Sequence, residues 1–140
     1  MFLLDTNTIS ELRKIALGRA HANVAAWERV HLPSELFVSV ITLLEIEVGI
    51  LRLAQKDRGR SETLKQWRDA HVLPFFEGRI FEVTQDISAR CAALHVPKSR
   101  PAHDALIAAT AIVHGLTVVT RNTVDFGAMG VKMLNPWESQ

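Results

Sequence analysis

Acidic side chains stand where apolar runs of this sequence end or begin. Asp5 ends the opening run "MFLL", Glu45 follows the β-branched run "LFVSV", and Asp104 lies at the start of "HDALIAATAIVHG". Asn122 and Asp125 follow a further run, "LTVV". Carboxylate and amide oxygens are hard ligands that suit Mg²⁺ or Mn²⁺, which take one or two carboxylates directly and keep several waters. If these side chains meet, a divalent cation would offset charges that are costly to bury unpaired.

Each acid also has a structural explanation of its own. The segment "TLLE", ending at Glu45, and the segment "TISE", ending at Glu11, both match a capping box at a helix N-terminus. Asp104 could complement a helix macrodipole, and Asp5 could cap a turn. We interpret Glu11 as structural. The metal hypothesis for the other acids therefore depends on whether the fold brings them together.

The elements that would position these acids are short β-branched runs alternating with helical stretches. We expect strands at 2–4, 36–40, 79–83 and 116–119, with a short edge strand at 131–134. We expect helices at 9–17, 20–30, 43–54, 61–72, 85–95 and 102–114. This alternation predicts an α/β fold with a mostly parallel central sheet of four or five strands and helices on both faces. Ligands of such folds bind beyond the carboxyl ends of the strands, where the sequence places these acids.

The helix expected at 102–114 is small or apolar on every side after Asp104, until His114. A helix with that pattern is buried. A carboxylate at its entry has less water around it than one on a surface helix. This pattern therefore favours a metal or a specific hydrogen-bond donor at Asp104.

Composition limits the class of protein. A chain of 140 residues buries one sizeable core, so we predict a single domain spanning 1–140. No stretch approaches the roughly 20 apolar residues of a membrane span, and no secretory signal pattern is present. The lone Cys91, expected to be buried, favours a cytoplasmic protein, and the histidines show no zinc spacing. For His103 we favour a surface or core position over a role in the site.

Together these segments resemble a known family. "LLDTNTISEL", "VSVITLLEIEVGI", "DALIAATAIVHGLTVVTRNTVDF" and the closing "NPW" are similar, in order and spacing, to PIN-domain ribonucleases, and specifically to the VapC-type toxins of VapBC toxin-antitoxin pairs in the FitB-like subgroup. The likeness covers nearly the whole chain. It implies a single PIN-like domain and Mg²⁺-dependent cleavage of RNA.

By this resemblance Asp5, Glu45 and Asp104 match the three principal acidic positions of the family. The fourth position, often Asp, falls on Asn122, and Asp125 could compensate for the missing charge. A metal held by Asp5 and Asp104 would activate a water for attack on a phosphodiester, with Glu45 sharing the metal or acting as a base. Candidates for hydrogen bonds to water or substrate follow the same strands: Thr6, Asn7, Thr120 and Arg121.

Positive charge is concentrated in "LRLAQKDRGRSETLKQWR", which includes Arg52, Lys56, Arg58, Arg60, Lys65 and Arg68, and again at Lys98 and Arg100. Such side chains could hold RNA phosphates, or could form a solvated helix face. Arg121, beside the predicted site, is the stronger candidate for a phosphate clamp.

The resemblance also implies partners. VapC-type toxins usually form homodimers and are held inactive by a VapB-type antitoxin, in toxin-antitoxin hetero-oligomers. Transfer RNA is a common target in the family. Trp27, Trp67, Leu51 and Leu53 are candidate anchors for a partner, or core residues.

Two other functions fit parts of the sequence. "FLLDTNT" resembles the D-x-D-x-T signature of haloacid-dehalogenase-like phosphatases, in which Asp5 would be the nucleophile. Asn7 stands where that family has its acid/base, and no later motif of that family is present. The other alternative is a non-catalytic PIN-fold binding module, which only Asn122 favours.

Overall fold

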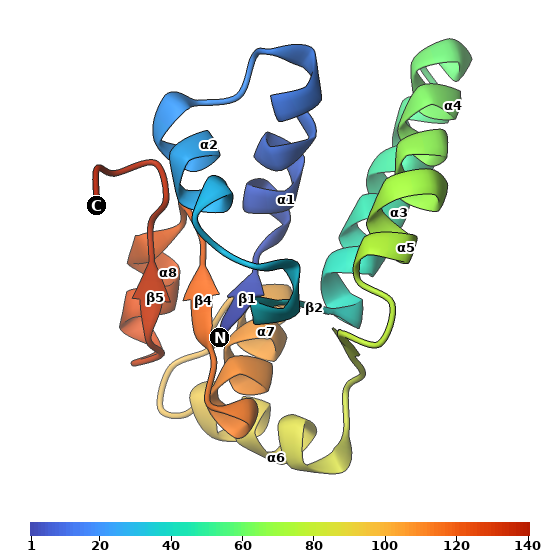
Figure 1. Ribbon diagram of the computed structural model, residues 1–140. Coiled ribbons are helices and arrows are strands. Elements are labelled where there is room, and N and C mark those ends of the chain that lie inside the picture. Colours follow the sequence, from blue (N-terminus) through green and yellow to red (C-terminus); the bar gives the residue numbers. More distant parts are fainter.

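The computed structural model describes all residues from 1 to 140 and contains one five-stranded sheet in which every pairing is parallel. The strand order is β3-β2-β1-β4-β5, so the first strand is central (Figure 1). The strands are β1 (Phe2–Leu4), β2 (Leu36–Ser39), β3 (Ile80–Phe81), β4 (Thr117–Val119) and β5 (Met133–Leu134). The predicted α/β fold with a parallel sheet is confirmed, and the edge strand expected at 131–134 is present.

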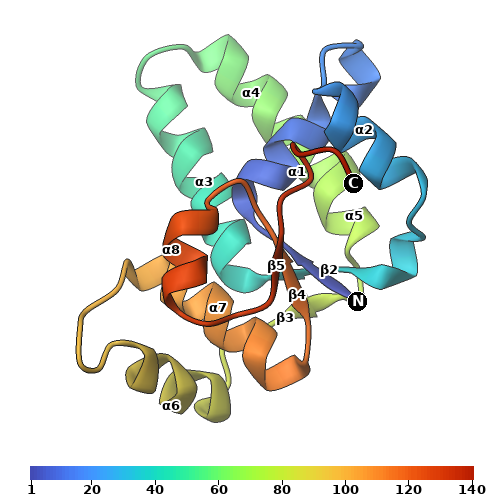
Figure 2. The same ribbon diagram turned by 90° about the vertical axis from the view of Figure 1, so that its left-hand side faces the viewer.

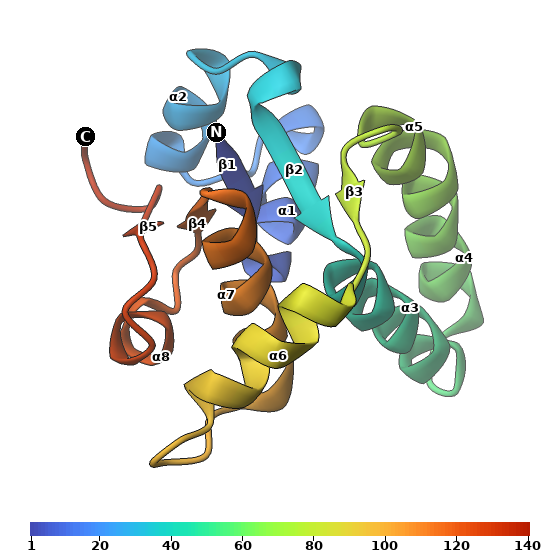
Figure 3. The same cartoon turned by 90° about the horizontal axis from the view of Figure 1, so that it is seen from below.

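Helices cover both faces of the sheet. The α-helices are α1 (Thr6–Arg13), α2 (Ala22–Arg29), α3 (Val40–Ala54), α4 (Arg58–Trp67), α5 (Leu73–Phe75), α6 (Gln85–Leu94), α7 (Ala102–His114) and α8 (Thr123–Ala128). Short 3₁₀ turns at Ile15–Leu17 and Pro33–Glu35 and a π-helical segment at Arg68–Val72 complete the chain. Figures 2 and 3 show α6 and α7 on one side of the strands and α1 and α2 on the other. None of these helices is both long and apolar enough to cross a bilayer.

The sheet separates two apolar cores, because successive side chains of a strand point to opposite faces. Leu3 and Val118 pack with α6, α7 and α8, while Leu4 and Val119 pack with α1, α2 and α3. All four side chains are fully buried. Burying each such side chain contributes about 1.5–3 kcal/mol, so the central strands are held from both sides. Their carboxyl ends are therefore a rigid base for polar side chains.

Two helices begin earlier than the sequence indicated. Helix α1 begins at Thr6 because the side chain of Asp5 caps it, and α3 begins at Val40 because the Ser39 hydroxyl accepts a hydrogen bond from the Ile41 amide at 3.0 Å. Both predicted capping boxes are wrong. Glu45 lies in the second turn of α3 and not in the first, so it caps nothing.

Other boundaries differ because tertiary contacts extend or shorten the elements. The helix expected at 61–72 begins at Arg58, where Asp57 caps it, and continues with an irregular stretch as far as Phe75. The strand expected at 79–83 is reduced to Ile80–Phe81. Helix α8 was missed. The helix expected at 102–114 is confirmed, and it ends at Gly115, whose φ of 67° suits glycine.

Candidate active site

Asp5 lies at the carboxyl end of the central strand and is 5% exposed. One of its oxygens, Oδ1, accepts a hydrogen bond from the Thr6 amide at 2.8 Å. The other, Oδ2, accepts from the Thr120 hydroxyl at 2.8 Å and from the Asn7 side-chain amide at 3.3 Å. Burial raises the pKa of Asp5, the hydrogen bonds from Thr120 and Thr6 act against that rise, and the nearby charge of Glu45 adds to it. No cationic side chain neutralises this carboxylate.

Thr120 joins the ends of the two neighbouring strands. Its side chain is fully buried. Its hydroxyl donates a hydrogen bond to Asp5 and accepts one from the backbone amide of Asn122 at 2.9 Å. The Thr8 hydroxyl adds a second tie by donating to the Val119 carbonyl at 2.9 Å. Thr120, predicted as a substrate contact, therefore has a positioning contact with Asp5 in the structure.

Replacing Thr120 by Val is expected to lower metal affinity and any metal-dependent activity by roughly 10- to 100-fold, the usual cost of losing a hydrogen bond that orients a metal ligand. Valine keeps the shape of the side chain but removes the hydroxyl that holds Asp5. Calorimetric titration of the variant with Mn²⁺ measures the change in metal affinity. Thr120→Ser keeps the hydroxyl and serves as the control. Equal affinity in the Val variant and the wild type would remove Thr120 from the site.

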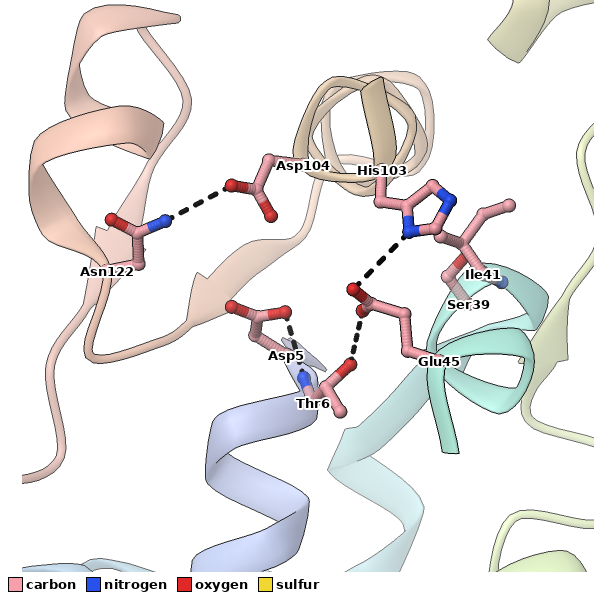
Figure 4. A network of polar contacts seen from close by, with 8 residues as sticks. All are labelled: Asp5, Thr6, Ser39, Ile41, Glu45, His103, Asp104 and Asn122. Atoms are coloured by element: carbon pink, nitrogen blue, oxygen red, sulfur yellow. Dashed lines mark hydrogen bonds and ion pairs between the residues drawn. The ribbon is translucent and has the colours of Figure 1, made fainter. Parts of the chain in front are cut away.

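Glu45 reaches the same place from the second turn of α3. Its Oε1 accepts a hydrogen bond from the Thr6 hydroxyl at 2.6 Å, and its Oε2 lies 3.4 Å from Nδ1 of His103 (Figure 4). The Thr6 contact ties α1 to α3 directly beside Asp5. His103 is exposed, which confirms the surface position expected for it, but its contact with Glu45 was not expected. The only sign of that contact in the sequence was the position of His103 next to Asp104.

Asp104 enters the site from the first turn of α7, as predicted. The Asn122 side-chain amide donates one hydrogen bond to Asp104 Oδ2 at 3.1 Å and one to Asp125 Oδ2 at 3.0 Å. The pKa of Asp104 is raised to about 6, mainly by burial and in addition by the charges of Asp5, Glu45 and Asp125, while His103 acts against the rise. The neutral amide thus bridges two carboxylates without supplying the positive charge that they lack.

The donor chemistry of this cluster fits a divalent cation. Figure 4 shows the carboxylates of Asp5, Glu45 and Asp104 around one space, and no lysine or arginine forms an ion pair with any of them. As the side chains stand, however, no three His, Cys, Asp or Glu residues are placed closely enough to hold an ion together. It is the oxygen ligands, and not their present spacing, that suit Mg²⁺ or Mn²⁺, because each of these ions accepts one or two carboxylates and keeps water on its other positions.

Two more predicted residues lie beside the cluster. The Asn7 side chain accepts a hydrogen bond from the Arg121 amide at 3.3 Å while its own amide donates to Thr120. The Arg121 guanidinium lies over the Trp137 ring, 5.4 Å from its centre. A role for Arg121 as a phosphate clamp stays a prediction, and its stacking partner in the closing "NPW" segment was not foreseen.

The basic residues predicted to hold RNA differ in their surroundings. Arg68 forms ion pairs with Glu47 and Asp69, so its charge is balanced. Arg100 hydrogen-bonds to the Leu94 carbonyl at 3.4 Å. Arg60 forms no ion pair and lines a cleft. Only part of the predicted basic surface is therefore free to meet an anion.

The residues predicted to anchor a partner also differ from one another in their exposure. Trp27 is 3% exposed and belongs to the core, whereas Leu51 is 59% exposed. Trp67 and Leu53 are partly buried and line the same cleft as Arg60.

Comparison with known proteins agrees with this geometry. The PIN domain family matches residues 2–131. The chain is 38% identical to the VapC ribonuclease Y4jK of Sinorhizobium fredii, over 99% of each chain. Its fold superposes with a TM-score of 0.87 on a chain of FitAcB from Neisseria gonorrhoeae, at 34% identity and 99% coverage of both chains. A toxin-antitoxin complex from Klebsiella pneumoniae contains a chain with a TM-score of 0.66 and 30% identity, also at 99% coverage of both.

The agreement covers nearly the whole chain, since the family match begins in the first strand and ends just before the last. The segments that resembled VapC-type toxins are those that deliver Asp5, Glu45, Asp104 and Asn122 to the carboxyl edge of the sheet. The chain belongs to the PIN-domain family, within the group that contains VapC and FitB.

Proposed function

We propose that this protein is an endoribonuclease that depends on Mg²⁺ or Mn²⁺ and acts as the toxin of a type II toxin-antitoxin pair. The observation that supports it best is the meeting of Asp5, Glu45 and Asp104, from three separate segments, with no lysine or arginine paired to any of them. The 38% identity to a VapC ribonuclease over nearly the whole of both chains supports the same reaction class.

In this proposal Asp5 and Asp104 hold the metal. A bound divalent cation lowers the pKa of a water and offsets negative charge on the phosphate. Glu45, held by Thr6 and partly exposed, takes the proton of the attacking water or shares the metal. Asn122 and Thr120 orient the two metal ligands, Asp104 and Asp5.

The remaining predicted side chains, Thr6, Asn7 and Arg121, border the same edge of the sheet, and we propose that they contact the phosphates of the substrate. Asp125 accepts a hydrogen bond from Asn122, and we propose it as an outer metal ligand. Its charge raises the pKa of Asp104, which means that it is near enough to add to the field felt by a cation.

We further propose that a VapB-type antitoxin inhibits this chain, that the toxin forms a homodimer, and that the complex is cytoplasmic. The likeness to a chain of a solved toxin-antitoxin complex supports the first part. An uncompensated acidic cluster is also a favourable place for a basic side chain of a partner. Transfer RNA is the substrate that we would test first.

The phosphatase alternative has less support. Asn7 stands where the phosphatase family has its acid/base, and its side-chain amide donates hydrogen bonds to Asp5 and Thr120. An amide cannot serve as the general acid or base that the phosphatase reaction needs. The presence of all three main acids speaks against the non-catalytic alternative, and the RNA cleavage assay below tests it.

Incubation of the antitoxin-free protein with a defined RNA pool that includes transfer RNA tests the proposal. With Mg²⁺ or Mn²⁺ we expect cuts that leave 5′-phosphate and 3′-hydroxyl ends. EDTA and the Asp5→Asn variant should each abolish them, since one removes the cation and the other removes its ligand. Cuts that persist in EDTA would contradict the metal, and hydrolysis of a small phosphoester without RNA cleavage would favour a phosphatase.

A further inference from the structure

A cleft of about 660 Å³ lies between the end of α1, with its following 3₁₀ turn, and the α3–α4 hairpin. Four of the ten residues that line it are basic, namely Arg13, Lys14, Arg19 and Arg60, and none is acidic. The Ser10 and Thr63 hydroxyls line it as well. The cleft is separate from the acidic cluster, and its charge has the opposite sign.

The positive charge of the cleft is largely unbalanced. Lys14 contacts Glu11 at 3.1 Å, but Arg13, Arg19 and Arg60 have no carboxylate within ion-pair distance. The Arg13 guanidinium lies over the Trp67 ring, 5.5 Å from its centre. The cleft thus offers three unpaired guanidinium groups beside an aromatic side chain and two hydroxyls, a set of groups that binds phosphates and stacks with bases.

One face of α1 connects this cleft to the acidic cluster. Thr6, whose hydroxyl contacts Glu45, is followed at helical spacing by Ser10 and Arg13, both of which line the cleft. At 1.5 Å per residue, Arg13 lies roughly 10 Å along the helix axis from Thr6. Figure 1 shows α1 and the α3–α4 hairpin extending from the same edge of the sheet. A nucleic-acid strand that follows this face of α1 would pass from the acidic cluster to the arginines of the cleft within a few nucleotides.

We propose that the cleft binds the sugar-phosphate backbone of single-stranded RNA on one side of the cleavage point. The inference rests on the proposed nuclease function, which already requires a polyanionic strand beside Thr6. An acidic peptide would also be attracted to the arginines. RNA is the better occupant because the same helix face that leads into the cleft begins at the site where a phosphate must lie.

Binding of a fluorescein-labelled single-stranded RNA of mixed sequence tests the proposal, measured by anisotropy in EDTA so that no cutting occurs. The variant carries Arg19→Gln and Arg60→Gln, two exposed side chains whose backbone contacts stay intact. The control carries Arg29→Gln and Arg90→Gln, which remove the same charge from exposed sites on α2 and α6. Thermal melting checks that both variants fold.

We expect the cleft variant to bind RNA at least tenfold more weakly at low salt, and the control to stay within twofold of the wild type. The slope of log K against log salt should also become shallower by about 1.4, since each cation that meets a single strand contributes about 0.7. Equal losses in the cleft variant and the control would overturn the proposal, because non-specific charge would then explain binding.

A labelled oligo-glutamate peptide separates the two classes of ligand. If the cleft variant loses affinity for the peptide but keeps its affinity for RNA, the cleft is a peptide site and the proposal is wrong. The assay is independent of cleavage. If the protein binds RNA through these arginines but never cuts it, the proposed nuclease function is wrong and the proposed binding site stands. If the protein cuts RNA but its affinity for RNA does not depend on these arginines, the binding site is wrong and the nuclease function stands.

Discussion

Asp104→Asn is expected to lower metal-dependent RNA cleavage by about 1,000-fold while leaving the fold intact. The charges of Asp5, Glu45 and Asp125 repel that of Asp104, and its one side-chain hydrogen bond is accepted from the Asn122 side-chain amide. An asparagine oxygen can accept the same hydrogen bond, so the fold does not depend on the charge. Loss of a metal ligand removes several kcal/mol of stabilisation of the transition state, and each 1.36 kcal/mol is a factor of ten in rate. Single-turnover cleavage of an identified RNA at saturating Mg²⁺ measures the loss.

The same variant should be more stable than the wild type when no metal is present. The pKa of Asp104 is raised from 3.8 in the reference state to about 6 in the folded protein, mainly by burial. Its favourable contribution is therefore complete below pH 3.8 and is lost as the pH rises through 6. Asp104 is only half-buried, so we expect a gain of about 1 kcal/mol for the Asn variant at pH 7.5. At pH 5, midway between the two pKa values, we expect roughly half of that gain, and below pH 3.8 none.

Urea unfolding in EDTA at pH 5, 6 and 7.5 measures that difference. Asp86→Asn, an exposed acid in the first turn of α6, is the matched control and should show no such stabilisation at pH 7.5. Wild-type cleavage by the Asp104 variant, from a preparation free of other nucleases, would remove Asp104 from the site. A variant that is less stable at pH 7.5 would contradict the electrostatic account.

Asn122→Asp is expected to destabilise the metal-free protein by about 1–3 kcal/mol and to strengthen Mg²⁺ or Mn²⁺ binding at least tenfold. The Asn122 amide donates to Asp104 and Asp125, at 3.1 and 3.0 Å. A carboxylate in its place would donate nothing and would add a third negative charge, leaving polar groups unsatisfied and like charges close together. A cation would relieve both costs, so the gain in affinity and the loss of stability have one cause.

Thermal melting in EDTA and calorimetric titration with Mn²⁺ measure the two effects. Asn122→Ala removes the amide without adding charge, so it should lose stability but gain no affinity. Weaker metal binding by the Asp variant would show that the amide itself, and not its neutrality, supports the metal. A second equivalent of Mn²⁺ bound only by the Asp variant would show that the natural Asn restricts the site to one ion.

The sequence by itself determined the layout of this protein. Alternating β-branched and helical runs predicted a parallel sheet, and the small, apolar pattern of 102–114 predicted the buried helix that the structure confirms. Because carboxyl ends of parallel strands share one edge, the positions of Asp5 and Glu45 after their strands were enough to predict that they lie near each other. The fold class and the buried helix follow from local sequence patterns, and the proximity of Asp5 and Glu45 follows from the geometry of a parallel sheet.

Only the tertiary structure decided which groups touch at the site. The box around Glu45 was a plausible local pattern, but Ser39 caps α3 and leaves Glu45 to meet Thr6, a residue 39 positions away. The contacts of Thr120 with Asp5 and of Asn122 with Asp104 span 115 and 18 positions. The cleft beside Arg60 is likewise formed by helices distant in sequence. Long-range hydrogen bonds depend on packing to within a fraction of an ångström, which helical and strand periodicity do not specify.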